Sequence, residues 1–340
     1  MASWQSRTLK LGFRLQALSE SFSEGVNVPR GRTEMELLAR GAGRPSHCEC
    51  TKCRVVDLPS EWIVPDHPLP GRTLLYIHGG GYFFGSINTH RQLAADVANA
   101  VQAHTLIFEY RLAPEHRYPA ALEDTLAVYR HLIATGTDPA QLILAGDSAG
   151  GGLTLAAMVA LRDAGEPLPA LAVCFSPWTD LAGTGESMVT RAKADPWFNP
   201  RQMPHAARYY VGDQDPTTLP LASPLYADLH GLPPLLIQVG RDEILLSDST
   251  RLAEKAQAAG VDVTLEVWPD MMHVWQAFAR FVPEGRSALD HVATFAHAHL
   301  PPPCIDKDGL TASYVRIGPK GQLQPIFVSK CENQELGSKN

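Results

Sequence analysis

Ser148 gives the clearest chemical signal in this sequence, because it stands at the centre of the stretch Gly146-Asp147-Ser148-Ala149-Gly150. An apolar run, Leu142 to Ala145, comes directly before this stretch, and a helical pattern of small and apolar residues follows it. A buried strand must therefore turn into a helix almost at once, and glycines allow this because they lack a Cβ atom. Such a turn predicts a serine nucleophile exposed above the end of the strand.

A second glycine-rich stretch, His78-Gly79-Gly80-Gly81, follows the apolar run Thr73 to Ile77. Glycine-rich loops can bind phosphate, but this loop matches neither the dinucleotide-binding nor the P-loop pattern. Glycines also allow backbone N–H groups to come close to a substrate, since no side chain blocks the approach. The loop is therefore expected to stabilise negative charge that develops on an oxygen atom.

A serine nucleophile needs a base, and an acid that orients the base, and two residues occupy suitable places. Asp242 follows the apolar run Leu235 to Val239 within three residues, and His273 follows the run Val263 to Val267 after a short loop. The order serine, aspartate, histidine along the chain is typical of a nucleophile on a strand-to-helix turn. We expect Asp242 to be the acid and His273 the base.

Other carboxylates near these positions have simpler interpretations. Glu243 is expected to point away from the site and to act as a carboxylate at the start of a helix. Asp248 lies where a helix should begin and is expected to cap it. Asp270 is expected to be a turn residue.

Apolar runs of strand length alternate with helical patterns along most of the chain. The strand runs are Thr73–Ile77, Thr105–Phe108, Leu142–Ala145, Leu171–Phe175, Leu235–Val239 and Val263–Val267, and the helical patterns lie near Asn88–Ala103, Pro119–Ala134, Gly150–Ala164, Asp248–Ala259 and Gly285–Leu300. This alternation predicts the α/β class, with a mostly parallel sheet and helices on both faces. The carboxyl ends of parallel strands share one edge of the sheet, so the three candidate catalytic residues should meet there.

Two segments lie outside the alternation. Residues 1–45 are expected to form cap helices, and an amphipathic stripe follows Trp4 at Leu11, Leu15, Leu18 and Phe22. Residues 180–225 form a polar, aromatic-rich insert within the catalytic domain, which is expected to span 46–300. Both segments are consistent with surface packing or with a lid over the strand ends. Beyond residue 300 the tail to residue 340 has no helical pattern; two short runs around Gly318–Gly321 suggest a hairpin without an evident function.

The composition excludes several classes of protein. The chain has 340 residues and a formal net charge of −7, which argues against nucleic-acid binding. No apolar run is long enough to cross a bilayer, and the N-terminus lacks a signal-peptide pattern, so we expect a cytoplasmic protein. Cys48, Cys50 and Cys53 have no matching second half of a zinc site and are expected to be free thiols, so no metal is predicted.

The separated motifs resemble those of one family, the hormone-sensitive-lipase-like, HGGG-containing branch (bacterial family IV) of the α/β-hydrolase esterases. The matching stretches are His78–Gly81, Tyr110–Glu115, Gly146–Gly151, Gly240–Leu245 and Met272-His273. They occur in the expected order, and the resemblance covers roughly residues 5–300.

This resemblance implies an α/β-hydrolase fold with a helical cap and hydrolysis of a small-molecule carboxylic ester without a cofactor. It assigns Ser148, Asp242 and His273 to the triad and gives the backbone N–H groups of Gly80, Gly81 and Ala149 as the oxyanion hole. In this family the histidine of the glycine loop is structural. A homodimer formed through edge strands is a further implication.

Aromatic residues in the glycine loop and the insert are expected to close a limited pocket for short to medium acyl chains. The candidate substrate-binding residues are Phe83, Phe84, Asp147, Trp197, Phe198 and Tyr209, with Asp147 also expected to steady the turn around the serine. Two alternatives stay open. One is an amidase or deacetylase with the same triad, since both reactions are acyl transfers. The other is an inactive small-molecule binding module on the same fold.

Overall fold

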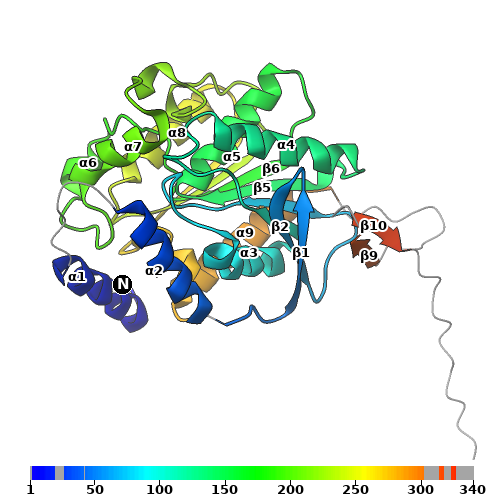
Figure 1. Cartoon of the computed structure of the whole chain (residues 1–340), viewed down its shortest axis with the longest axis horizontal. Coiled ribbons are helices and arrows are strands. Elements are labelled where there is room, and N and C mark those ends of the chain that lie inside the picture. Colours follow the sequence, from blue (N-terminus) through cyan, green and yellow to red (C-terminus); the bar gives the residue numbers. More distant parts are fainter. Residues whose placement is uncertain (1, 20–26, 42, 302–313, 318–322, 327–340) are drawn as a thin grey trace, which may run out of the picture.

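A computed structural model describes residues 2–19, 27–41, 43–301, 314–317 and 323–326 (Figure 1). Its longer elements are helices α1 (Trp4–Ser19), α2 (Val28–Gly41), α3 (Ile87–Val101), α4 (Ala120–Ala134), α5 (Ala149–Asp163), α6 (Ser187–Thr190), α7 (Met203–Val211), α8 (Leu246–Ala258) and α9 (Pro283–His299), and strands β1 (Cys48–Val55), β2 (Leu58–Pro65), β3 (Thr73–Ile77), β4 (His104–Phe108), β5 (Leu142–Asp147), β6 (Leu171–Phe175), β7 (Leu235–Gly240), β8 (Val263–Trp268), β9 (Tyr314–Ile317) and β10 (Leu323–Ile326).

Strands β1 to β8 form one sheet in the order β1-β2-β4-β3-β5-β6-β7-β8. Strands β3 to β8 pair in parallel, whereas β2 pairs antiparallel with both β1 and β4. The parallel strands β3 to β7 are buried along their whole length, which explains their continuous apolar sequences. The predicted α/β class is therefore confirmed.

Helices cover both faces of the sheet (Figure 1). Helices α3 and α9 pack against each other and against one face, where their apolar residues join a core with Ile107, Val173 and Leu236. Helices α4, α5 and α8 cover the opposite face in a second core, which includes Leu106, Leu144 and Ile237. Alternate residues of a strand point to opposite faces, so each buried strand contributes side chains to both cores. The loops at the strand ends thus rest on a sheet that is packed from both sides.

The sequence around Cys53 and Val55 favours a strand, but its patterns did not predict that this region forms the antiparallel hairpin β1–β2. Its two-residue turn, Val56-Asp57, lies between the paired residues Val55 and Leu58. Both turn residues have positive φ, 45° and 66°. Such turns favour Asn-Gly or Asp-Gly, so Val-Asp gave no turn signal. Cys48, Cys50 and Cys53 lie on β1 as free thiols, and burial raises the pKa of Cys53 to about 11.

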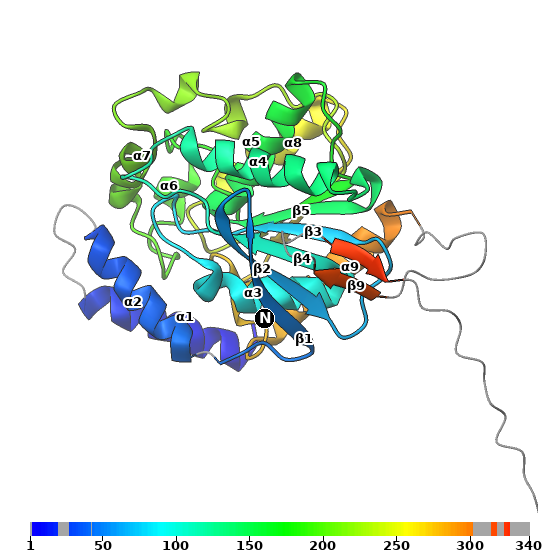
Figure 2. The same ribbon diagram turned by 45° about the vertical axis from the view of Figure 1, so that its right-hand side comes forward.

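The two segments outside the strand–helix alternation lie on the same side of the molecule. In both Figure 1 and Figure 2, helices α1 and α2 lie on the same side of the molecule as α6 and α7. The ring of Phe13 in α1 stacks on Trp197 of the insert at a centroid distance of 4.7 Å. Arg14 also donates to the carbonyl of Ala194. The segments therefore contact each other, as a two-part lid requires.

Helix α1 turns part of its amphipathic stripe toward solvent. Leu11 and Leu15 belong to the amphipathic stripe, yet their exposed fractions are 56% and 58%. Helix α1 instead packs through Ser6, Lys10 and Phe13. The side chains of Leu18 and Phe22 lie outside the described residues.

Beyond the main body, β9 and β10 pair antiparallel, in agreement with the hairpin suggested by the sequence. No helix in the described ranges is both long and apolar enough to cross a membrane.

Candidate active site

Ser148 lies at the turn between β5 and α5 with φ 53° and ψ −122°. A positive φ is rare for a residue with a side chain, and this one is fixed by hydrogen bonds on both sides. Ser148 N donates to Phe175 O at 2.8 Å, and Ser148 O accepts from Trp178 N at 2.9 Å. The turn also depends on Gly150, where a Cβ atom would collide with the backbone oxygen of Ile77. The structure therefore has the sharp strand-to-helix turn that the glycines predict.

His273 lies in the loop after β8 and is buried, with an exposed fraction of 3%. Its Nδ1 atom lies 2.7 Å from Oε2 of Glu243. The other oxygen of that carboxylate accepts from Ser176 Oγ at 2.8 Å and from Gly240 N at 2.6 Å. A buried carboxylate that accepts these bonds is well suited to hold the imidazole in one orientation.

Asp242 was expected to orient His273 and Glu243 to point away from the site, and both expectations are wrong. The carboxylate that contacts His273 belongs to Glu243, not to Asp242. The turn after β7 decides this, because Asp242 N donates to Met271 O and holds its backbone against the histidine loop. The Asp242 side chain then points toward α1, where Oδ2 forms an ion pair with Lys10. Glu243 in turn reaches back under the strand end, and its exposed fraction is 0%.

Ser148 and His273 are brought to adjacent positions at the end of β6. Ser148 N donates to Phe175 O, and Val274 N, next to His273, donates to Ser176 Oγ at 3.2 Å. No hydrogen bond joins the Ser148 hydroxyl to His273 among the described residues. Such bonds are often long before substrate binds.

The glycine loop has the backbone geometry needed for an oxyanion hole. Gly80 and Gly81 have φ values of 116° and 63°, which disfavour any residue with a side chain. The N–H groups of Gly80, Gly81 and Ala149 donate to no residue within the described ranges. The Ala149 N–H also belongs to the first turn of α5, where the helix leaves its N–H groups free.

Asp147 supports this loop and does not face a substrate. Its carboxylate is buried and accepts from Tyr76 Oη at 2.8 Å and from Gly79 N at 3.1 Å. Its other oxygen lies 3.4 Å from Nε2 of His90. The assignment of Asp147 to substrate binding is therefore wrong, because its oxygens are engaged beneath the loop, and its expected role in steadying the turn fits these contacts.

His78, at the start of the glycine loop, is also a structural residue. Its ring stacks on Tyr110 at a centroid distance of 4.2 Å, and its Nδ1 atom lies 2.8 Å from Gly79 O. Burial, followed by the nearby His90, lowers the pKa of His78 to about 3. The imidazole is therefore neutral and packs as an aromatic ring.

The aromatic residues that were expected to bind substrate lie in two groups. Phe198 and Trp197 contact the imidazole of His273 edge-on, at centroid distances of 4.7 and 6.0 Å. Phe83, Phe84 and Tyr209 lie together at the glycine loop, with Phe83 between the other two at 4.6 and 5.3 Å. The first group lies beside the histidine and the second beside the glycine loop.

Asp248 has a different role from the expected helix cap. Its buried Oδ2 atom accepts from Thr179 N at 2.9 Å and Asp180 N at 2.8 Å, so it holds the start of the insert. Burial raises the pKa of Asp248 to about 8. Asp270 is a turn residue as expected, with φ 59°.

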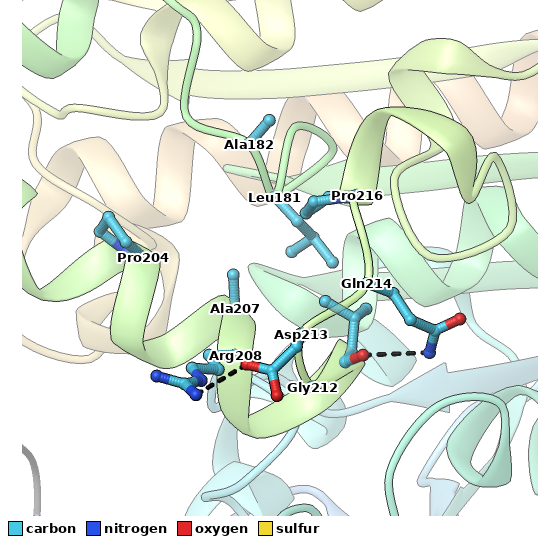
Figure 3. Close-up of a pocket in the computed structure, with 10 residues that line it drawn as sticks. Leu181, Ala182, Pro204, Ala207, Arg208, Gly212, Asp213, Gln214 and Pro216 are labelled. Carbon is cyan, nitrogen blue, oxygen red and sulfur yellow. Dashed lines mark hydrogen bonds and ion pairs between the residues drawn. The ribbon is translucent and has the colours of Figure 1, made fainter.

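A pocket of about 460 Å³ lies between helix α7 and the chain that follows β6. Leu181, Ala207 and Val211 line it, and the ion pair of Arg208 and Asp213 lies beside it (Figure 3). The candidate catalytic residues do not line this pocket; they are Ser148, Asp242, Glu243 and His273. We therefore do not assign the acyl group to it.

Gly81→Val is expected to lower kcat by about 10²–10³-fold, the effect of losing one oxyanion donor. A Cβ at position 81 would come within 2.8 Å of the Phe83 ring, and φ 63° strains a β-branched residue, so the loop must shift. Gly71→Val is the matched control, because Gly71 has φ 75° and open space around it. Steady-state kinetics on one ester measure both. A rise in KM alone, with kcat intact, would show that the loop only shapes the pocket.

Comparisons with known proteins identify the family of this chain. A family model described as alpha/beta hydrolase fold matches residues 74–277. An acetyl-hydrolase of Streptomyces hygroscopicus is 48% identical over 236 residues, which cover 69% of this chain and 78% of the relative. An esterase of Acinetobacter venetianus is 40% identical, over 66% of this chain and 74% of its own length. The crystal structure of an esterase from the bacterial hormone-sensitive lipase family is 44% identical and superimposes with a TM-score of 0.83, covering 88% of this chain and all of the other.

The chain therefore belongs to the α/β-hydrolase family, in the hormone-sensitive-lipase-like branch that its motifs resemble. Within that branch it is a serine carboxylesterase, an enzyme that hydrolyses carboxylic esters.

Proposed function

We propose that the enzyme hydrolyses esters with short to medium acyl chains through an acyl-enzyme on Ser148, with His273 as the base and Glu243 as the acid. One observation carries the proposal, the 2.7 Å contact between His273 Nδ1 and Glu243 Oε2. A carboxylate at Nδ1 favours the tautomer whose Nε2 atom can accept a proton, and it stabilises the imidazolium that follows.

The proposed reaction has two acyl-transfer steps. Ser148 Oγ attacks the ester carbonyl while His273 Nε2 takes the hydroxyl proton. The backbone N–H groups of Gly80, Gly81 and Ala149 receive the negative charge on the carbonyl oxygen. The carbon–oxygen bond to the alcohol then breaks, and the alcohol leaves with the proton from His273. Water attacks the acyl-enzyme in the same way and releases the carboxylic acid and free Ser148.

The proposed limit on acyl length rests on the aromatic residues around the histidine. Phe198 and Trp197 contact His273, and Trp197 is covered in turn by Phe13 from α1. Aromatic rings packed against one another resist displacement by a long chain. A crystal structure of a relative, EstE5, was obtained with soaking in p-nitrophenyl butyrate. That relative is 44% identical and superimposes with a TM-score of 0.83, covering 88% of this chain and 99% of its own. That ester has a short acyl chain, which supports a short-chain substrate here.

A series of p-nitrophenyl esters tests this limit. We expect kcat/KM to rise up to about fourfold for each CH₂ that fits, to reach its maximum at C4 to C8, and to fall at C16. Phe198→Ala should move the maximum to longer chains, whereas Phe281→Ala, a change at an exposed phenylalanine, should not. Wild-type activity on palmitate that equals or exceeds its activity on butyrate would contradict the proposal.

The same assay separates the ester hydrolase from the amidase alternative. Matched p-nitroanilides present the same acyl groups with an amine as leaving group. We expect turnover of the esters and at least about 10²-fold slower turnover of the anilides, because an amine is the poorer leaving group. Faster turnover of an anilide than of the matching ester would favour the amidase.

Two further properties remain predictions. Strand β8 is the last strand of the sheet on one side, which is consistent with a homodimer formed through this edge. Light scattering on the full chain would test it. A cytoplasmic location is the other proposal, and fractionation of the source cells would test it.

A further inference from the structure

The outward face of α1 carries an apolar stripe that no described residue covers. Trp4, Leu11 and Leu15 have exposed fractions of 73%, 56% and 58%. Their spacing of seven and four residues places the three side chains on one side of the helix. Large apolar side chains grouped on a surface usually indicate a place of interaction.

The charges of α1 have one sign. The helix contains Arg7, Lys10 and Arg14 and no acidic residue, although the whole chain carries a formal charge of −7. Lys10 points inward to Asp242, whereas Arg7 and Arg14 are exposed and form no ion pair with any residue that the structure describes. Arg14 donates from one nitrogen to the carbonyl of Ala194, which leaves its positive charge without an acidic partner among those residues. Because the two arginines are seven residues apart, they lie in one row beside the apolar stripe. A partner for this face should therefore be apolar and negatively charged.

The inner face of α1 fixes the helix beside the active site. Ser3 donates to Glu284 through its hydroxyl at 2.8 Å, and Lys10 contacts both Asp242 and the backbone oxygen of Asp270. Phe13 stacks on Trp197, which in turn contacts His273. The outer stripe is therefore held facing away from the body, on the side of the molecule where the strands end and the catalytic residues lie.

We propose that the outer face of α1 docks on an anionic phospholipid surface. Trp and Leu on one side of a helix with neighbouring arginines suit the boundary between lipid headgroups and acyl chains. The arginines would lie against lipid phosphates, and the stripe would enter the apolar layer. A second copy of the chain fits this face less well, because a two-fold pairing of α1 would bring its arginines close to one another. Docking would place the active site next to esters dissolved in the membrane surface.

Co-sedimentation of the full chain with vesicles tests this proposal independently of the catalytic assignments. We expect binding to vesicles of equal parts phosphatidylcholine and phosphatidylglycerol, none to phosphatidylcholine alone, and weaker binding as salt is raised. The variant Trp4→Ser/Leu11→Ser/Leu15→Ser should lose binding. Arg7→Gln/Arg14→Gln should weaken it by about thirtyfold, from the usual contribution of a basic residue near such a surface.

Matched controls change an exposed apolar residue and two basic residues outside α1. Val189→Ser alters another exposed apolar residue, on α6, and Lys52→Gln/Arg54→Gln removes two positive charges from β1. Both controls should bind like the wild type, and every variant should keep its circular dichroism spectrum and its activity on p-nitrophenyl butyrate. The proposal is overturned if the wild type does not bind the mixed vesicles or if the triple variant binds them equally well. It is also overturned if light scattering shows a dimer that the triple variant converts to a monomer.

Discussion

Ser148→Ala and His273→Ala are each expected to lower kcat by about 10⁴-fold or more. In the proposed mechanism Ser148 supplies the atom that becomes acylated, and His273 is the base that activates it in both steps. Because the two residues act as one unit, the double variant should be little slower than either single variant. Steady-state kinetics with p-nitrophenyl butyrate measure all three.

His230→Ala is a suitable control for this set, because His230 is exposed and pairs only locally with Asp228. It should keep the wild-type rate. Circular dichroism establishes that each variant is folded. Near wild-type turnover by folded Ser148→Ala would remove Ser148 from the mechanism.

Glu243→Gln is expected to lower kcat by about 10³–10⁴-fold, whereas Asp242→Asn should change it less than tenfold. Glutamine keeps the size of the side chain but loses the charge that stabilises the imidazolium. Asp242 contacts Lys10 and not the imidazole, so its loss should mainly loosen α1.

The two neighbouring carboxylates thus serve as controls for each other. Glu243→Asp retains the charge on a shorter side chain and should recover part of the lost activity, which a purely structural role would not explain. A large loss for Asp242→Asn together with an active Glu243→Gln would restore the assignment made from the sequence. Thermal unfolding of each variant separates loss of fold from loss of chemistry.

The sheet could be predicted well because strands that are buried on both faces have continuously apolar sequences. Runs such as Leu142 to Ala145 are continuously apolar because helices cover both of their faces, and each glycine at the Ser148 turn meets backbone that would exclude a side chain. The sharp turn at Ser148 and the positive φ values of the glycine loop could be predicted for the same reason, because both depend on residue types at fixed spacing.

The carboxylate that contacts His273 was not predictable in that way. Asp242 and Glu243 follow the same strand, and the path of the turn decides which of them reaches His273. That path depends on the bond from Asp242 N to Met271 O, which joins loops far apart in the sequence. A pattern of residue types holds no information on such a contact.

The face through which α1 packs could not be predicted from the sequence, for a similar reason. The helix is anchored not through its leucine stripe but through Lys10 and Ser3, whose partners lie more than 200 residues away in the sequence. A helix with an apolar side and a basic side can pack either way until its partners are known. The structure shows which side packs.

The pair of Asp147 and His90 sets a range of pH over which the glycine loop is firmly held. Although burial opposes charge on both groups, His90 keeps the pKa of Asp147 below its usual value, and Asp147 keeps the pKa of His90 above its usual value. The Asp147 carboxylate therefore stabilises the folded protein above its unfolded pKa, and this stabilisation is lost as the pH falls through its lower folded pKa. The His90 imidazole stabilises the folded protein below its unfolded pKa, and this stabilisation is lost as the pH rises through its higher folded pKa.

The contributions of Asp147 and His90 to the stability of the fold are both complete only in mildly acidic solution. The contribution of His90 persists until the pH passes its raised pKa. In more alkaline solution Asp147 would remain a buried anion without its counter-ion, directly beneath the Gly79 N–H that it holds. We therefore expect an alkaline limit to stability that comes from the support of the glycine loop.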